Sequence, residues 1–132
     1  MKYLLDTNSL SKSAYSRAHS HKDICILEEV RDEFTSHGSS NTKRIPHAVE
    51  IINIEAKHLR KLQELMVEEG ANFDLIRLYT AEGTADAMIL AFVLCERDNP
   101  DTLFPEEYVI VTTDTGLQSA AAKYGVKSIS KI

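Results

Sequence analysis

The sequence predicts an α/β fold, a three-layer α/β/α sandwich with a central parallel sheet. Short apolar runs of strand length alternate along the chain with longer segments of helical periodicity, which is typical of a parallel sheet covered on both faces. The expected strands are also continuously apolar, as strands buried on both faces are. No internal repeat and no flexible linker interrupts the 132 residues, so we expect one domain over residues 1–132.

The first half of the chain supplies three of the expected strands. The apolar run Tyr3 to Leu5 is ended by Asp-Thr-Asn-Ser, a sequence that favours a helix cap, so a helix is expected from Ser9 to His21. The following apolar and amphipathic patterns predict a strand over 24–27, a helix from 28 to about Gly38, a polar loop over 37–47, a strand over 49–54 and a helix over 56–69.

The second half begins with a helix over 84–95 that is apolar nearly all round and must therefore be buried. After it we expect a buried strand over 108–112, a helix of small residues over 116–124 and a last short strand over 126–129. Strands and helices thus alternate to the end of the chain, which supports the parallel sheet.

Composition and charge describe an ordinary globular chain. Hydrophobic residues make up 43% and charged residues 27%, so disorder is not expected. The net charge of −5 by itself argues against a nucleic-acid partner, because phosphate backbones attract basic surfaces. That argument weakens if several carboxylates share a metal site, because bound cations reverse the local field. Net charge therefore does not decide the partner.

Cysteines and the chain start give simple expectations. Cys25 and Cys95 lie in apolar stretches and are expected to be buried free thiols, with no second cysteine at a metal-binding spacing. None of the five histidines has a ligand spacing either. The opening apolar run is interrupted by Asp6, so we expect no signal peptide. No apolar run approaches the ~18 residues that span a bilayer. We expect a cytoplasmic protein without a membrane segment.

Four carboxylates occur where the expected strands end or the expected helices begin. Asp6 and Asp114 follow apolar strands, Asp86 opens the apolar helix, and Glu33 lies in the helix after the second strand. In an open parallel sheet these positions gather along one edge, where ligands bind. Clustered carboxylates repel each other unless a cation neutralises them, and magnesium prefers oxygen ligands. The sequence therefore predicts a metal-dependent phosphodiester enzyme.

Helical phase singles out Glu33 among four acids on one short helix. At about 100° per residue, Glu33 lies closest to the apolar stripe, Glu29 lies on its flank, and Glu28 and Asp32 point away. The stripe is set by Ile26, Leu27, Val30 and Phe34. Only Glu33 is therefore expected to reach inward from this helix.

Each of the other acids also has a structural explanation. Asp6 and Asp114 are suited to cap the helices that follow them, and Asp86 is placed to favour the dipole of its helix. The occurrence of these acids together favours a functional site. The helix that Asp86 opens is too apolar to lie on the surface, so a charge on it needs a partner or a metal.

The pattern resembles the PIN-domain ribonucleases, and the short single-domain form resembles the VapC-type toxins of toxin–antitoxin pairs. The matching segments are spread over nearly the whole chain. They are Leu-Leu-Asp-Thr-Asn-Ser, Val-Arg-Asp-Glu-Phe, Ala-Asp-Ala-Met-Ile-Leu-Ala and Val-Ile-Val-Thr-Thr-Asp-Thr-Gly-Leu. The loop over 37–46 and the insert over 98–107 depart from a typical toxin.

The resemblance implies a PIN-like fold and a set of functional residues. The catalytic and metal-binding quartet falls on Asp6, Glu33, Asp86 and Asp114, and polar support falls on Asn8 and on Thr112 or Thr113. It further implies Mg²⁺ or Mn²⁺ as cofactor, RNA as substrate, a homodimer, and an antitoxin partner for toxin members.

Basic side chains that could hold RNA are few. The best pair is Lys43 and Arg44 in the polar loop, with Lys12 as a further substrate-binding candidate. Weaker candidates are Arg17, Lys57 and Arg60.

Competing functions remain open at this point. Hydrolases with an aspartate nucleophile carry a second Asp two residues after the first, where this chain has Asn8. A phospho-acceptor domain needs a lysine after its last strand, whereas Lys127 stands at the start. The further alternatives are a catalytically idle PIN-like module that binds RNA or protein, and an RNA-processing nuclease without an antitoxin. The complete quartet favours the metal-dependent ribonuclease.

Overall fold

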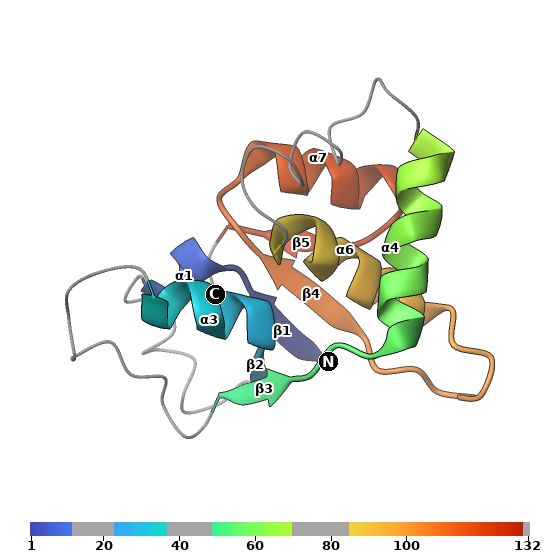
Figure 1. The fold of residues 1–132 in the computed structure, drawn as a ribbon, viewed down its shortest axis with the longest axis horizontal. Helices are drawn as coiled ribbons and strands as arrows, with labels where there is room; N and C mark the ends of the chain where they lie inside the picture. Colours follow the sequence, from blue (N-terminus) through green and yellow to red (C-terminus); the bar gives the residue numbers. More distant parts are fainter. Residues whose placement is uncertain (12–22, 37–48, 70–84, 131–132) are drawn as a thin grey trace.

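The computed structural model describes residues 1–11, 23–36, 49–69 and 85–130. Five parallel strands form one sheet in the order β3-β2-β1-β4-β5 (Figure 1), so the predicted parallel sheet is confirmed. Its strands are β1 (Lys2–Leu5), β2 (Asp23–Leu27), β3 (Glu50–Ile52), β4 (Tyr108–Val111) and β5 (Ser128–Ile129).

The strand order creates a switch point between β1 and β4. From β1 the chain moves outward through β2 to β3, and it then crosses back to β4 and moves outward to β5 on the other side. β1 and β4 pair in register from Lys2 opposite Tyr108 to Leu5 opposite Val111. Their carboxyl ends therefore lie side by side where the strand order reverses, which is where open α/β sheets bind ligands.

The described helices form two packed groups. They are α1 (Thr7–Ser11), α3 (Glu28–Ser36), α4 (Ala56–Glu69), α6 (Ala85–Arg97) and α7 (Thr115–Lys123). α1 packs against α3, whereas α6 packs against both α4 and α7 (Figure 1). Since parallel crossovers are right-handed and the chain reverses direction at β4, the two groups cover opposite faces. The result is the expected α/β/α sandwich.

The core lies between the sheet and these helices, and α6 is its most buried helix. Every side chain from Ala87 to Leu94 is buried, as the all-round apolar sequence predicts. Phe92 is 1% exposed and contacts the ring of Tyr108 edge-on, with 5.1 Å between ring centroids. Among the described helices, none is both long and apolar enough to cross a membrane.

Some elements differ from the expectation. α1 is described from Thr7 to Ser11, and the rest of the helix expected over 9–21 lies outside the described residues. β3 is shorter than predicted, because Asn53 to Glu55 form no strand and instead lead into α4. Cys25 is buried as expected, but Cys95 is half-buried because it lies near the end of α6, where the helix leaves the core.

Candidate active site

Asp6 follows β1 directly and is buried, with 4% of its surface exposed. Its Oδ1 accepts a hydrogen bond from the backbone N–H of Ser9 at 2.8 Å, so Asp6 caps α1 as its sequence position predicts. Its backbone N–H donates to the carbonyl oxygen of Val111 at 3.2 Å, and the Ser9 hydroxyl donates to the same oxygen at 2.9 Å. The carboxylate is thereby fixed at the junction of β1 and β4.

Thr112 connects Asp6 to Asp114. Its buried hydroxyl donates to Oδ2 of Asp6 at 2.5 Å and accepts a hydrogen bond from the backbone N–H of Asp114 at 3.0 Å. Its carbonyl oxygen accepts from the side-chain amide of Gln118 at 2.9 Å. Between the two threonines considered from sequence, Thr112 therefore makes the contacts to the acids, and Thr113 is exposed.

Asp114 is the N-cap of α7. Its Oδ1 accepts from the backbone N–H of Leu117 at 3.0 Å, and its carbonyl oxygen accepts from the N–H of Gln118. The structural explanation for this residue is thus correct, and it does not compete with a role in the site. A carboxylate has about four lone-pair positions, and the cap uses one of them.

Glu33 joins the site through Thr7. The Thr7 hydroxyl donates to Oε2 of Glu33 at 2.7 Å, across the contact between α1 and α3. Thr7 is the residue after Asp6, so one dipeptide connects the acid of β1 to the acid of α3. Helical phase placed Glu33 on the inward side of its helix, and its bond to the residue beside Asp6 agrees with that placement.

The other acids of α3 have different surroundings. Asp32 is exposed, as expected, and it forms an ion pair with Arg31. Glu28 does not point away, because its Oε1 accepts from the backbone N–H of Ile54 at 3.4 Å and anchors the segment after β3. Glu29 has a buried Oε2 without a hydrogen-bond partner, and burial raises the pKa of its carboxyl.

Several predicted residues are only partly visible or fall outside the described residues. Asp86 lies in the first turn of α6, but its side chain is not described. Asn8 lies in α1 with an exposed side chain. The basic candidates Lys12, Lys43 and Arg44 lie outside the described residues.

The donor chemistry at this edge suits a hard divalent cation. The three acids whose side chains are described offer only oxygen atoms, and no described lysine, arginine or histidine forms an ion pair with Asp6 or Asp114. Buried carboxylates without a cationic partner are unfavourable. Among the described residues, however, the ligand atoms of these three acids do not all lie within 4.8 Å of one another.

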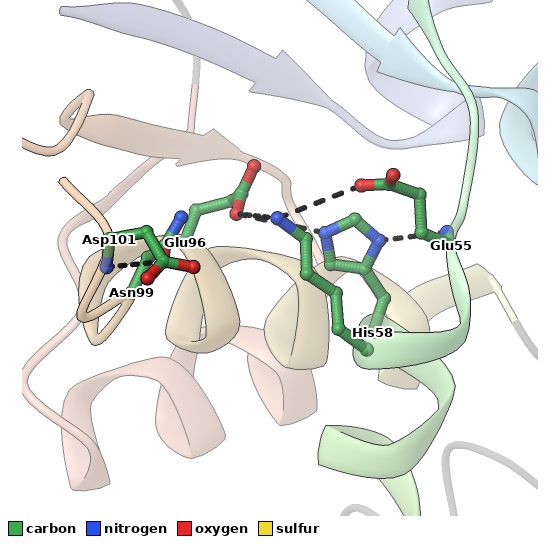
Figure 2. Close-up of polar contacts among 6 residues, drawn as sticks. Glu55, His58, Glu96, Asn99 and Asp101 are labelled. Atoms are coloured by element: carbon green, nitrogen blue, oxygen red, sulfur yellow. Dashed lines mark hydrogen bonds and ion pairs between the residues drawn. The ribbon is translucent and has the colours of Figure 1, made fainter.

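A second cluster, at the contact of α4 and α6, does bring such atoms together, and Figure 2 shows its His58 and Glu96. His58, Cys95 and Glu96 have ligand atoms within 4.8 Å of one another, and His58 is 1% exposed. The backbone N–H of Glu55 donates to Nδ1 of His58 at 2.9 Å, so the neutral ring carries its proton on Nε2. That Nε2 faces Glu96 Oε2 at 3.8 Å. In this tautomer Nε2 has no lone pair to offer an ion.

Lys57 supplies the charge that this second cluster needs. Its Nζ lies 3.3 Å from Oε2 of Glu96 and 3.6 Å from Oε2 of Glu55. The bond to Glu96 raises the pKa of Lys57, whereas burial lowers the pKa of His58. Ion pairs in this cluster join the start of α4 to α6, and Lys57, one of the weaker RNA-binding candidates, takes part in two of them.

Comparison with known proteins comes from structure alone, because no family model and no curated protein matches the chain. The structure search finds a chain in the crystal structure of VapBC2 from Rickettsia felis bound to a DNA fragment of the VapBC2 promoter. That chain matches this one with a TM-score of 0.62 and 17% sequence identity. The match covers 98% of both chains. The fold is that of a VapC-like PIN domain. At this identity the likeness establishes the fold and not the activity.

Three residues of this VapC-like fold at the site were missed by sequence reasoning. Thr7, Ser9 and Gln118 hold the backbone and side chains around the acids through the bonds described above. Thr7 and Ser9 stand on either side of Asn8 in the first motif, so their position was a usable signal. Gln118 carried none, because its contact to Thr112 depends on how α7 packs beside β4.

Proposed function

We propose that this protein is a metal-dependent endoribonuclease, using Mg²⁺ or Mn²⁺, and that it serves as the toxin of a VapBC-type pair. The observation that carries the proposal is the pair Asp6 and Asp114, joined through Thr112 at the switch point of the sheet without a cationic partner among the described residues. The fold supports it, because Asp6 and Asp114 follow β1 and β4 at the switch point of the sheet, where open α/β sheets bind ligands.

The carboxylate oxygens of the four acids would hold the cation. Asp6 and Asp114 follow the ends of β1 and β4, Asp86 lies in the first turn of α6, and Glu33 lies in α3. When bound, a divalent ion lowers the pKa of a water and polarises a phosphoryl oxygen. The hydrogen bonds from Thr112 and Ser9 keep the Asp6 carboxylate in one orientation, so that its oxygens are already placed to bind an ion.

The partners follow from the same proposal. RNA is the substrate, and the protein acts as a homodimer whose site is blocked by an antitoxin. The solved neighbour is a VapBC2 complex, which supports an antitoxin partner. The reading frame beside the gene tests the toxin role: a small neighbour encoding a DNA-binding protein supports it, and an isolated gene favours an RNA-processing nuclease.

The decisive experiment measures RNA cleavage with and without divalent cations. Cleavage should need Mg²⁺ or Mn²⁺ and stop with excess chelator, and Asp6→Asn should abolish it. Glu33→Gln should also lower it sharply, whereas Asp32→Asn, the matched exposed acid on the same helix, should change little. Cleavage that persists in chelator, or products with a 2′,3′-cyclic phosphate, would overturn the mechanism, since the second result means attack by the ribose hydroxyl.

A further inference from the structure

We propose that the connection between α6 and β4 is a dimer contact, in which Leu103 and Phe104 of one copy enter a cavity of a second copy. The inference rests on the homodimer of the proposed function and names the surface that forms it. Leu103 is 92% and Phe104 is 90% exposed, more than any other large hydrophobic side chain among the described residues. Two adjacent apolar side chains left in water mark a contact surface.

The segment 98–107, which carries this apolar pair, projects from the body of the molecule and yet is anchored at both ends (Figure 1). Near its start, the backbone N–H of Asp101 donates to Oδ1 of Asn99 at 3.0 Å. At its end, the carbonyl oxygen of Glu107 accepts from the backbone N–H of Lys2 at 2.8 Å. An anchored segment loses less conformational freedom when a partner binds, which favours association.

A cavity of about 230 Å³ adjoins the end of the same segment. Val93, Tyr108 and Val126 give it apolar walls, and Glu107 is among its charged lining residues. The volume is below the ~300–1,000 Å³ of small-molecule pockets and suits a large side chain. Phe104 stands three residues before Glu107, within about 11 Å along the backbone. Phe104 is nevertheless too exposed to fill the cavity of its own chain.

The charges at the cavity favour a second copy as its occupant. Glu107 and Lys127 both line it, both are exposed, and neither forms an ion pair with another described residue. A two-fold axis can set the Glu107 of each copy against the Lys127 of the other. A surface with an apolar pair, a cavity that accepts a large side chain, and unpaired charges of both signs is complementary to itself, as a two-fold contact requires.

RNA does not suit this surface, because the segment 98–107 holds four acidic residues and no basic one, and such a segment repels phosphate. The size of the contact suits a dimer. A Phe side chain buries ~150–250 Å², and a two-fold contact uses the apolar pair of both copies and covers a similar area of the facing walls. The buried area is then on the order of 1,000 Å², the size expected of a specific interface.

The test measures the self-association constant of the whole chain by analytical ultracentrifugation. Phe104→Ser removes the aromatic side chain, and Val67→Ser, at a 77% exposed position on α4, is the matched control. Lys127→Glu sets two acids against each other, and the double variant Lys127→Glu with Glu107→Lys restores opposite charges. All four positions are exposed, so the variants should fold, and circular dichroism checks this.

Phe104→Ser should weaken dimerisation at least ~30-fold, the loss typical of an aromatic hot spot, and Val67→Ser should change it little. Lys127→Glu should also weaken it, and the double variant should recover the affinity. A dimer that Phe104→Ser leaves intact, or a double variant no tighter than Lys127→Glu, would overturn this interface and leave the homodimer standing. A wild type that stays monomeric would overturn both, whereas the ribonuclease proposal is judged separately by cleavage with Mg²⁺.

Discussion

Replacing Thr112 with valine should destabilise the protein before any metal is considered. The substitution keeps the side chain's shape and removes a buried hydroxyl that makes two hydrogen bonds. It deprives the buried Asp6 carboxylate of a donor at 2.5 Å and leaves the backbone N–H of Asp114 without its acceptor at 3.0 Å. Both groups lose a partner in a place where water does not replace it easily, because Thr112 is fully buried.

The expected magnitude follows from the two bonds. A hydrogen bond to a charged group contributes about 1.5–3 kcal/mol and a neutral one about 0.5–1.5 kcal/mol, so the loss should be about 2–4.5 kcal/mol. Unfolding entropy of about 2.1 cal/mol/K per residue converts this into a lowering of Tm by about 7–16 °C for a chain of this length.

Thermal unfolding followed by circular dichroism, in chelator at neutral pH, measures this difference. Thr113→Val is the control, since the neighbouring threonine is exposed and its replacement should stay within about 0.5 kcal/mol. Thr112→Ser keeps the hydroxyl and should retain most of the stability. If Thr112→Val melts within about 2 °C of the wild type, which is below the smallest loss expected from these bonds, then Thr112 does not hold the acids as described.

Three further predictions concern charge. Burial lowers the pKa of His58 below 6.5, so its contribution to stability is present above pH 6.5 and is lost as pH falls through the folded-state value; melting curves against pH should be flatter for His58→Gln. Burial raises the pKa of Glu29, so its ionised form costs stability at neutral pH. Glu29→Gln should therefore melt at a higher temperature than the wild type at pH 7, and this advantage should shrink as pH falls toward 4.5. A lower Tm for the variant at pH 7 would contradict this. Asp114→Asn keeps a good helix cap and removes one negative charge, so without metal it should melt at or above the wild-type temperature, whereas Mg²⁺ should raise the Tm of the wild type more than that of the variant.

The sequence by itself determined the fold class and the position of the acids along it. Continuous apolar runs can be buried only in a sheet covered on both faces, and a helix as apolar as α6 can lie only in the core. Since parallel strands end at one edge, the residues after β1 and β4 were expected at the same edge, and the strand order then makes them neighbours. Helical phase was enough to separate Glu33 from Asp32, because a period of 3.6 residues fixes which side of a helix meets the sheet.

Phase was not enough for Glu28, which was expected to point away and instead binds the backbone N–H of Ile54. An angle around the helix axis gives a direction, but it does not say which neighbouring segment lies there. The same limit explains why the choice between Thr112 and Thr113 stayed open, because the twist of β4 and the start of α7 decide which hydroxyl meets Asp6.

Tertiary structure alone decided the partners of each polar atom. Thr7 finds Glu33 across 26 positions of sequence, and Thr112 finds Asp6 across 106. His58 and Glu96 meet because α4 and α6 pack together, and the Glu55 N–H then sets which ring nitrogen carries the proton. Sequence patterns report burial, which depends on one residue's own polarity and on the period of its element. Hydrogen bonds depend on ångström-scale distances between separate elements, and those distances are fixed only when the whole core packs.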